Sequence, residues 1–111
     1  MIPHEFFHLL LWLLVAHALC DFPLQGDFLA KAKNHRAPIA NVEWFPCLTA
    51  HALIQAAGVG VVTNSVTLAA AEFTFHMLID WCKSEGLIGF GGDQVMHVAC
   101  RIIWAGIAIA C

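Results

Sequence analysis

The sequence predicts an all-α protein, a bundle of four transmembrane helices with up-down topology. The chain has 111 residues, of which 60% are hydrophobic and only 12% are charged, well below the roughly 25% usual in a soluble domain. Its apolar residues gather in four long segments, each close to the ~17–25 residues that a membrane-spanning helix requires. A very apolar soluble bundle is the alternative.

We expect one integral membrane domain over residues 1–111, with helices at about 6–22, 44–62, 65–81 and 94–111. The apolar start has no Lys or Arg before Phe6 and no small-residue cleavage site, so it should be retained and not removed as a signal peptide. Residues 27–34 could form a short amphipathic helix at the membrane interface. Residues 63–65 predict a tight turn, and a glycine-rich loop over 86–92 leads into the fourth helix.

The basic residues predict an orientation. Lys31, Lys33 and Arg36 lie in the first connection and Lys83 in the third, and up-down topology places these two connections on one side. By the positive-inside rule that side is cytoplasmic, which makes both termini periplasmic and the chain a multi-pass protein of the bacterial inner membrane. The lipid bilayer is therefore the expected partner. The net charge of −3, without a large basic patch, argues against nucleic acid.

A histidine and a carboxylate stand four residues apart in three places: His17 with Asp21, His76 with Asp80 and, in reverse order, Asp93 with His97. Helical positions i and i+4 lie on one face, so each pair presents both groups together. All three pairs fall near the cytoplasmic helix ends, as does a histidine early in the second helix. The predicted metal-binding residues are His17, Asp21, His51, His76, Asp80, Asp93 and His97.

Four imidazoles with three carboxylates favour a divalent transition metal, Zn, Mn, Fe or Ni, over Ca or Mg. Bundle proteins build dinuclear sites from such pairs on facing helices, so the pattern is compatible with two ions. A metal would lower the pKa of a bound water to about 7 and so prepare it for hydrolysis. Asp80 and Asp93 are the candidate catalytic residues, with Asp93 as a ligand or general base. Cys47 is a further candidate ligand, and the other four cysteines are expected to be free packing residues.

The third and fourth helices have a predicted register. Counting back in steps of four residues from Asp80 gives His76 and Glu72, and counting forward from Asp93 gives His97 and Arg101. If these helices are antiparallel, Glu72 and Arg101 meet ~12 Å deeper than the aspartates. A structural ion pair would make both charges tolerable at that depth.

A weak internal repeat relates residues 15–22 to residues 74–81. Two helical hairpins related by an axis along the membrane normal would bring their sites face to face. The same counting on the first two helices places Asp21 beside Cys47 and His17 beside His51. Simpler roles exist for some of these residues, since Asp93 is a candidate N-cap and interhelical hydrogen bonds worth ~0.6–2 kcal/mol could retain others. Seven residues at one depth nevertheless favour a functional site.

Three motifs carry a resemblance to a known family. The segments His17-x3-Asp21-Phe22-Pro23-Leu24-Gln25, His76-x3-Asp80 and Asp93-Gln94-x2-His97 resemble an uncharacterised family of small integral membrane proteins of bacteria and phages, a domain of unknown function. The resemblance covers most of the chain and implies a membrane location without an activity. A looser similarity connects the chain at fold level with membrane-bound metal-dependent hydrolases.

The predicted function is a metal-dependent hydrolase of a phosphate-bearing or lipid-linked substrate, which Lys31, Lys33 and Arg36 would attract. One alternative is a transporter or channel for metal ions or protons, which would need a polar path to the far side. Another is a non-enzymatic membrane-interaction protein of a bacterium or phage. A b-type haem between two histidines is a third, although clustered carboxylates make a poor haem pocket.

Overall fold

The computed structural model describes residues 4–111, and within that range it contains five α-helices and no strand. The helices are α1 (His4–Asp21), α2 (Gly26–Ala32), α3 (Trp44–Thr63), α4 (Val66–Ser84) and α5 (Phe90–Ala110). The all-helical class predicted from the sequence is therefore confirmed. Each of the four long apolar segments forms a helix, and the short amphipathic segment after the first of them forms α2.

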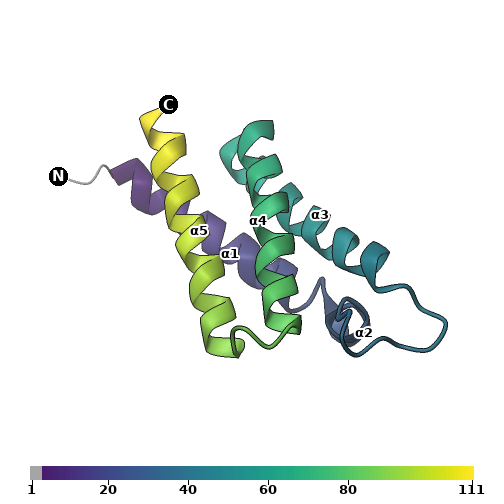
Figure 1. Ribbon diagram of the computed structural model, residues 1–111. Helices are drawn as coiled ribbons and strands as arrows, with labels where there is room; N and C mark the ends of the chain where they lie inside the picture. Colours follow the sequence, from purple (N-terminus) through teal and green to yellow (C-terminus); the bar gives the residue numbers. More distant parts are fainter. Residues whose placement is uncertain (1–3) are drawn as a thin grey trace.

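The four long helices form a ring in which α1 contacts α3 and α5, and α4 contacts the same two helices. Figure 1 shows that they alternate in direction, so the start of α1 and the end of α5 lie at the same end of the molecule. At the other end the chain bends by 83° between α1 and α2, and α2 packs against α3. The result is an elongated bundle of 51 × 23 × 22 Å.

Short connections have clear local causes. Gly26 has a φ of 67° at the bend into α2, a conformation that glycine adopts without steric cost. Asn64 ends α3 in the left-handed region, and the Ser65 side chain accepts a hydrogen bond from the Leu68 backbone N at 3.1 Å to cap α4. The tight turn predicted at residues 63–65 is confirmed.

The start of α5 differs from the prediction, because the helix begins at Phe90 and not at residue 94. Gly89 is the N-cap, and the Asp93 backbone N–H donates to the Gly89 carbonyl at 2.9 Å. Asp93 is thus a residue of the first turn and not the N-cap that its position after a glycine-rich stretch indicates. A carboxylate is favourable there, since the N-terminal end of a helix carries partial positive charge.

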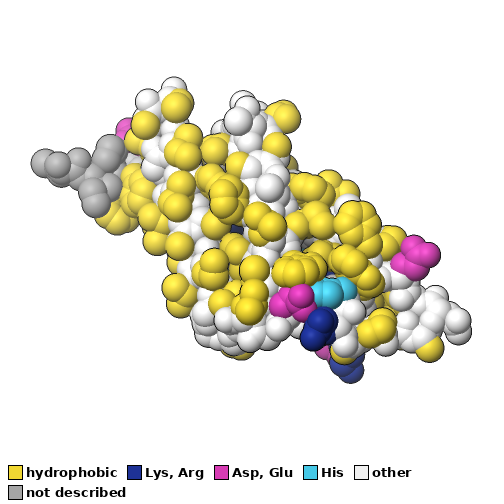
Figure 2. Space-filling model, in the orientation of Figure 1, with side chains coloured by type: hydrophobic (Ala, Val, Ile, Leu, Met, Phe, Trp, Pro, Cys, Tyr) yellow, Lys and Arg dark blue, Asp and Glu magenta, His cyan; other side chains and the backbone are white. Residues whose placement is uncertain are grey.

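The bundle has polar groups inside and many large hydrophobic groups outside. Within residues 4–111, eleven polar or charged residues are buried, while large apolar residues such as Leu11, Val61, Phe75 and Ile103 are exposed. Figure 2 shows hydrophobic side chains spread along the helices, with most of the visible charged side chains gathered near one end. Such apolar surface is costly in water but natural against lipid.

Hydropathy distinguishes among the helices. In the described part of the chain, α3 and α5 are each long and apolar enough to cross a membrane, and α1 with α2 meets the same criterion as one bent pair. The four predicted spans thus become two, or three with the bent pair, on length and composition. The helix α4 does not meet this criterion, because it contains Glu72, His76, Asp80 and Lys83, whose polarity lowers its mean hydropathy.

Candidate metal centre

The predicted ligands all lie inside the bundle. They come from α1, α3, α4 and α5, and each is at most 7% exposed. Residues 4–111 contain three groups of three side chains, and within each group the ligand atoms lie within 4.8 Å of one another. These groups are Asp21 with His51 and His76, Asp80 with Asp93 and His97, and Glu72 with His76 and His97.

Asp80 belongs to the second of these groups and also lies close to the two histidines of the first. Its Oδ2 atom lies 3.4 Å from His76 Nε2 and 3.6 Å from His51 Nε2, while its Oδ1 atom lies 3.1 Å from His97 Nε2. The Oδ2 atom also accepts a hydrogen bond from Lys33 Nζ at 2.8 Å. Because its two oxygens face different histidines, this carboxylate has the geometry of a bridge between two ligand clusters.

Glu72 determines how His76 is oriented. The Glu72 Oε2 atom lies 2.9 Å from His76 Nδ1, and since a carboxylate only accepts, Nδ1 carries a proton. His76 Nε2 then faces Asp80 and has no hydrogen-bond partner among the described residues. A lone pair facing a carboxylate is repulsive unless a proton or a metal ion lies between them.

His51 is in a similar position. Its Nε2 atom lies 3.2 Å from Asp21 Oδ1 and 3.6 Å from Asp80 Oδ2, again without a hydrogen-bond partner in the described part of the chain. Two ligands of one tetrahedral ion lie about 3.3 Å apart, because metal–nitrogen and metal–oxygen bonds measure about 2.0–2.2 Å. The observed nitrogen–oxygen separations therefore suit donors that share an ion.

The buried charges do not balance. Within residues 4–111, four buried carboxylates face only two buried cations, Lys33 and Arg101, while Lys83 approaches Asp93 at 3.8 Å from a partly exposed position. A divalent cation, or protons on the histidines, would offset the excess negative charge, which is expensive to bury unpaired. The buried carboxylates are Asp21, Glu72, Asp80 and Asp93.

The deep charged residues are in contact. Arg101 is fully buried, and its Nη2 atom lies 3.4 Å from Glu72 Oε2. Arg101 also donates a hydrogen bond to Gln55, and Trp104 Nε1 donates to Glu72 Oε1 at 2.8 Å. Glu72 thus has three partners, of which its spacing in the sequence indicated only Arg101 and His76.

The register of α1 against α3 differs from the predicted layers. Asp21 Oδ1 lies 3.2 Å from His51 Nε2 and accepts a hydrogen bond from Gln55 Nε2 at 3.3 Å, so its partners are one and two turns deeper than Cys47. Figure 1 shows α1 running obliquely behind α4 and α5, and counting in parallel steps fails for crossing helices. Cys47 is half-buried and belongs to none of the three ligand groups found within residues 4–111.

Gln94 is a further site residue, which the sequence indicates only through the Asp93-Gln94-x2-His97 motif. It accepts from His17 Nε2 at 3.2 Å and donates to Asp21 Oδ2 at 2.9 Å and to Asp93 Oδ2 at 3.2 Å. His17 thereby contacts α5 instead of His51, and it is outside the three ligand groups of the described range. The Asp93-Gln94 pairing in the sequence was the only available signal for this role.

Lys33 lies in the first connection, where the sequence predicts an interfacial segment that attracts an anionic substrate, but it is only 9% exposed and contacts Asp80. It follows α2 directly, and the bend after α1 brings it over the end of the bundle. Lys31, on the same short helix, is exposed, and Arg36 Nε pairs with Glu85 Oε2 at 3.2 Å. No local pattern distinguishes the buried lysine from its neighbours.

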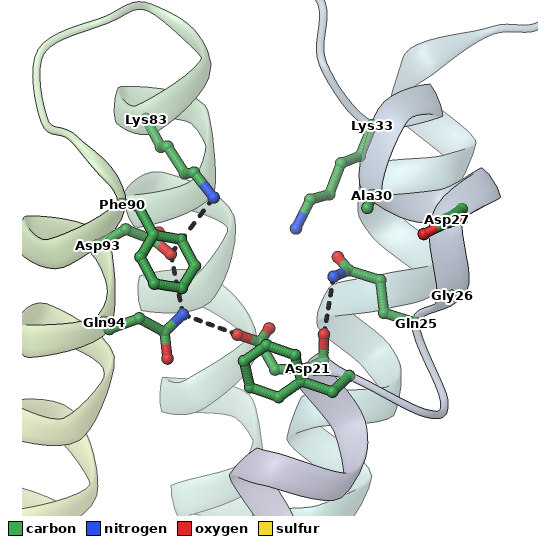
Figure 3. A pocket seen from close by; sticks show the side chains of 11 residues that line it. Asp21, Gln25, Gly26, Asp27, Ala30, Lys33, Lys83, Phe90, Asp93 and Gln94 are labelled. Carbon is green, nitrogen blue, oxygen red and sulfur yellow. Dashed lines mark hydrogen bonds and ion pairs between the residues drawn. The ribbon is translucent and has the colours of Figure 1, made fainter.

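A cavity of about 300 Å³ lies beside the cluster, at the end of the bundle where α2 is placed. Asp21, Asp93 and Gln94 form part of its wall, which continues into the α1–α2 bend. Figure 3 shows Lys83 and Lys33 extending toward each other from opposite sides of this cavity. Of the candidate ligands, Asp21 and Asp93 line this cavity, whereas Asp80 and the histidines lie behind its wall.

Comparisons with known proteins identify a family. No curated protein and no solved structure matches the chain. One family model, described as "Protein of unknown function (DUF3307)", matches residues 9–110 and so includes every candidate site residue. The uncharacterised family predicted from the motifs is confirmed, and the chain belongs to the DUF3307 family.

Proposed function

We propose that this protein is a multi-pass membrane protein whose buried histidines and aspartates bind one or two divalent transition-metal ions to hydrolyse a phosphate-bearing or lipid-linked substrate. One observation carries the proposal. The buried Nε2 atoms of His51 and His76 face carboxylate oxygens at 3.2–3.6 Å without a hydrogen-bond partner among the described residues, a separation that suits ligands on a shared ion. His97 Nε2 is beside them and is within hydrogen-bond distance of Asp80 and Asp93.

The proposed ligands divide into two sets joined by Asp80. Asp21, His51 and His76 form one set, and Asp93 with His97 forms the other. Glu72 supports the first set by accepting the His76 Nδ1 proton, a common arrangement for metal-bound histidines. Mixed nitrogen and oxygen donors favour Zn, Mn, Fe or Ni.

Hydrolysis follows from the chemistry of such a centre beside an accessible cavity. A bound divalent ion acidifies water and polarises an ester oxygen. Asp93 lines the cavity and is the better candidate for a general base, whereas Asp80 does not line it and faces three histidines and a lysine, which suits a bridging ligand. The nearby lysines would attract an anionic substrate.

We propose that α1 and α4 cross the membrane together with α3 and α5. On α1 the residues Leu11 and Val15 are exposed while His17 and Asp21 are buried, and on α4 Phe75 is exposed while Glu72 and Asp80 are buried. Both helices can therefore meet lipid with apolar faces despite their ionisable residues.

The orientation proposed is that of the positive-inside rule, with the basic connections cytoplasmic and both termini periplasmic in a bacterial inner membrane. A reporter fused after Arg36 should then be active in the cytoplasm, and one fused at Asn64 in the periplasm. The opposite pattern would move the metal centre to the outer face.

Transport is less well supported than hydrolysis. Beyond Arg101 the interior is filled by the apolar cluster of Leu13, Val59, Leu68, Trp104 and Ala105. An ion crossing the bundle would have to pass through these side chains without polar contacts, at a high desolvation cost. The polar region therefore resembles a one-ended site.

Metal analysis of the full chain in detergent tests the proposal. The wild-type protein, reconstituted with Zn, Mn, Fe or Ni, should retain metal, and His76→Ala should lose it because the remaining ligands are incomplete. His8→Ala, at an exposed position of α1, is the matched control and should bind as the wild type does. A wild type without metal, or full retention by His76→Ala, would reject the metal centre, and a metal-loaded protein inactive on a panel of phosphate esters would reject hydrolysis.

A further inference from the structure

Two lysines from different helices converge on the cavity beside the proposed metal centre. Lys33 follows α2, and its Nζ atom lies 2.8 Å from Asp80 Oδ2. Lys83 is in the last turn of α4, and its Nζ atom lies 3.8 Å from Asp93 Oδ2. Figure 3 shows the two ammonium groups facing each other across the cavity.

Each lysine has capacity for a further partner. An ammonium group carries three N–H donors, and Lys33 uses one of them on Asp80. Lys83 is 39% exposed at its side chain and is held near Asp93 at a distance beyond an ordinary hydrogen bond. An anion that entered between them would gain contacts from both lysines. The carboxylates of Asp21, Asp27 and Asp93 line the same cavity and would repel an anion unless a metal ion offsets their charge.

We propose that this cavity is a phosphate subsite, in which Lys33 and Lys83 hold the phosphate group of an ester against the metal centre. The inference rests on the proposed function and specifies its substrate class. A phosphate monoester carries about −1.5 to −2 charge near neutral pH and offers three strong acceptor oxygens. Two lysines and a divalent ion match that charge and number of oxygens, whereas a carboxylate has one charge and two oxygens.

The size and the rim of the cavity indicate where the rest of the ester lies. A volume of about 300 Å³ is at the small end of ligand sites, enough for a phosphate group with a short attached portion. Phe22 and Phe90 line the cavity and are 56% and 62% exposed, and Lys83 Nζ lies 5.3 Å from the Phe90 ring centre. An apolar substituent can thus leave the cavity along aromatic side chains toward lipid.

Equilibrium binding to the full chain in phosphatidylcholine nanodiscs, with and without Zn, tests the subsite. The two probes are inorganic phosphate and a phosphonate analogue of phosphatidic acid, neither of which can be hydrolysed. Lys33→Gln and Lys83→Gln should each weaken binding about 10- to 100-fold, as expected for loss of one charge-assisted hydrogen bond. Lys31→Gln, exposed on α2 and outside the cavity, is the matched control and should bind as the wild type does.

The outcomes identify the source of the phosphate group. They also distinguish a failure of the phosphate subsite from a failure of the metal centre. Binding of both probes indicates recognition of the phosphate group itself, and binding of the lipid analogue alone indicates a lipid headgroup. If neither probe binds, or if Lys83→Gln binds as tightly as the wild type, the subsite is overturned. Because Lys83 is partly exposed, its substitution keeps the test valid even if Lys33→Gln misfolds. Lysine-dependent binding by a protein that takes up no metal would support the subsite while rejecting the metal centre.

Discussion

The two halves of this bundle are built from the same four long helices and differ in chemistry. Around Asp80 the interior consists of histidines, carboxylates and lysine in contact with one another. Beyond Arg101 it consists of Leu13, Val59, Leu68, Trp104 and Ala105. The polar half is held by directional contacts with particular partners, and the apolar half by side-chain packing.

The difference has consequences in a membrane. Lipid tails are as apolar as leucine, so the apolar half gains little from excluding lipid and depends on close packing. In the polar half each group would be stranded in a low-dielectric interior if its partner were removed. Substitutions in the polar half should therefore change both stability and metal content, whereas those in the apolar half should change stability alone.

The largest effect is expected for Asp80→Asn, which removes the charge that joins the two ligand sets and faces Lys33. Bound metal should be lost, and the free energy of unfolding in detergent should fall by about 3–5 kcal/mol because the lysine remains buried and unpaired. Asp27→Asn, at an exposed position of α2 on the same cavity, is the control. Undiminished metal in Asp80→Asn would mean that Asp80 does not join the two ligand sets.

The boundary between the halves is the Glu72–Arg101 contact. Glu72→Gln and Arg101→Met should each cost about 3–5 kcal/mol of unfolding free energy, and the double variant should recover much of the loss. A double-mutant cycle in detergent measures the coupling directly. Simple additivity of the two losses would show that the side chains do not interact.

In the apolar half, Leu13→Ala should lower the free energy of unfolding by about 2–5 kcal/mol, because this fully buried side chain would leave a cavity. Metal content should remain that of the wild type, as determined by elemental analysis of the purified variant. If metal were lost in proportion to stability, the two halves would be one cooperative unit.

The smallest effect is expected at the turn between α3 and α4. Ser65→Ala removes the acceptor for the Leu68 backbone N–H and should cost about 1 kcal/mol without altering metal content. Ser65→Asp, which retains an acceptor, should restore most of the loss in the same unfolding measurement. Equal stability of all three proteins would show that this cap contributes nothing in the bundle.

The sequence by itself determined the helical class, the positions of the long helices and the inward face of α4 and α5. These features depend on local physics, since apolar length defines a helix that can meet lipid and a spacing of four aligns side chains on one face. The contact of Glu72 with Arg101 could be anticipated for the same reason, because adjacent antiparallel helices with a short connection keep their steps in register.

Only the tertiary structure decided how α1 and Lys33 join the site. The oblique course of α1 brings Asp21 to His51 and Gln55 and His17 to Gln94, and the 83° bend at α2 carries Lys33 to Asp80. Crossing angles and bends arise from packing among all the helices, so residues near in sequence, such as Lys31 and Lys33, can have opposite exposures. Contacts between distant segments are set by that geometry and not by spacing along one helix.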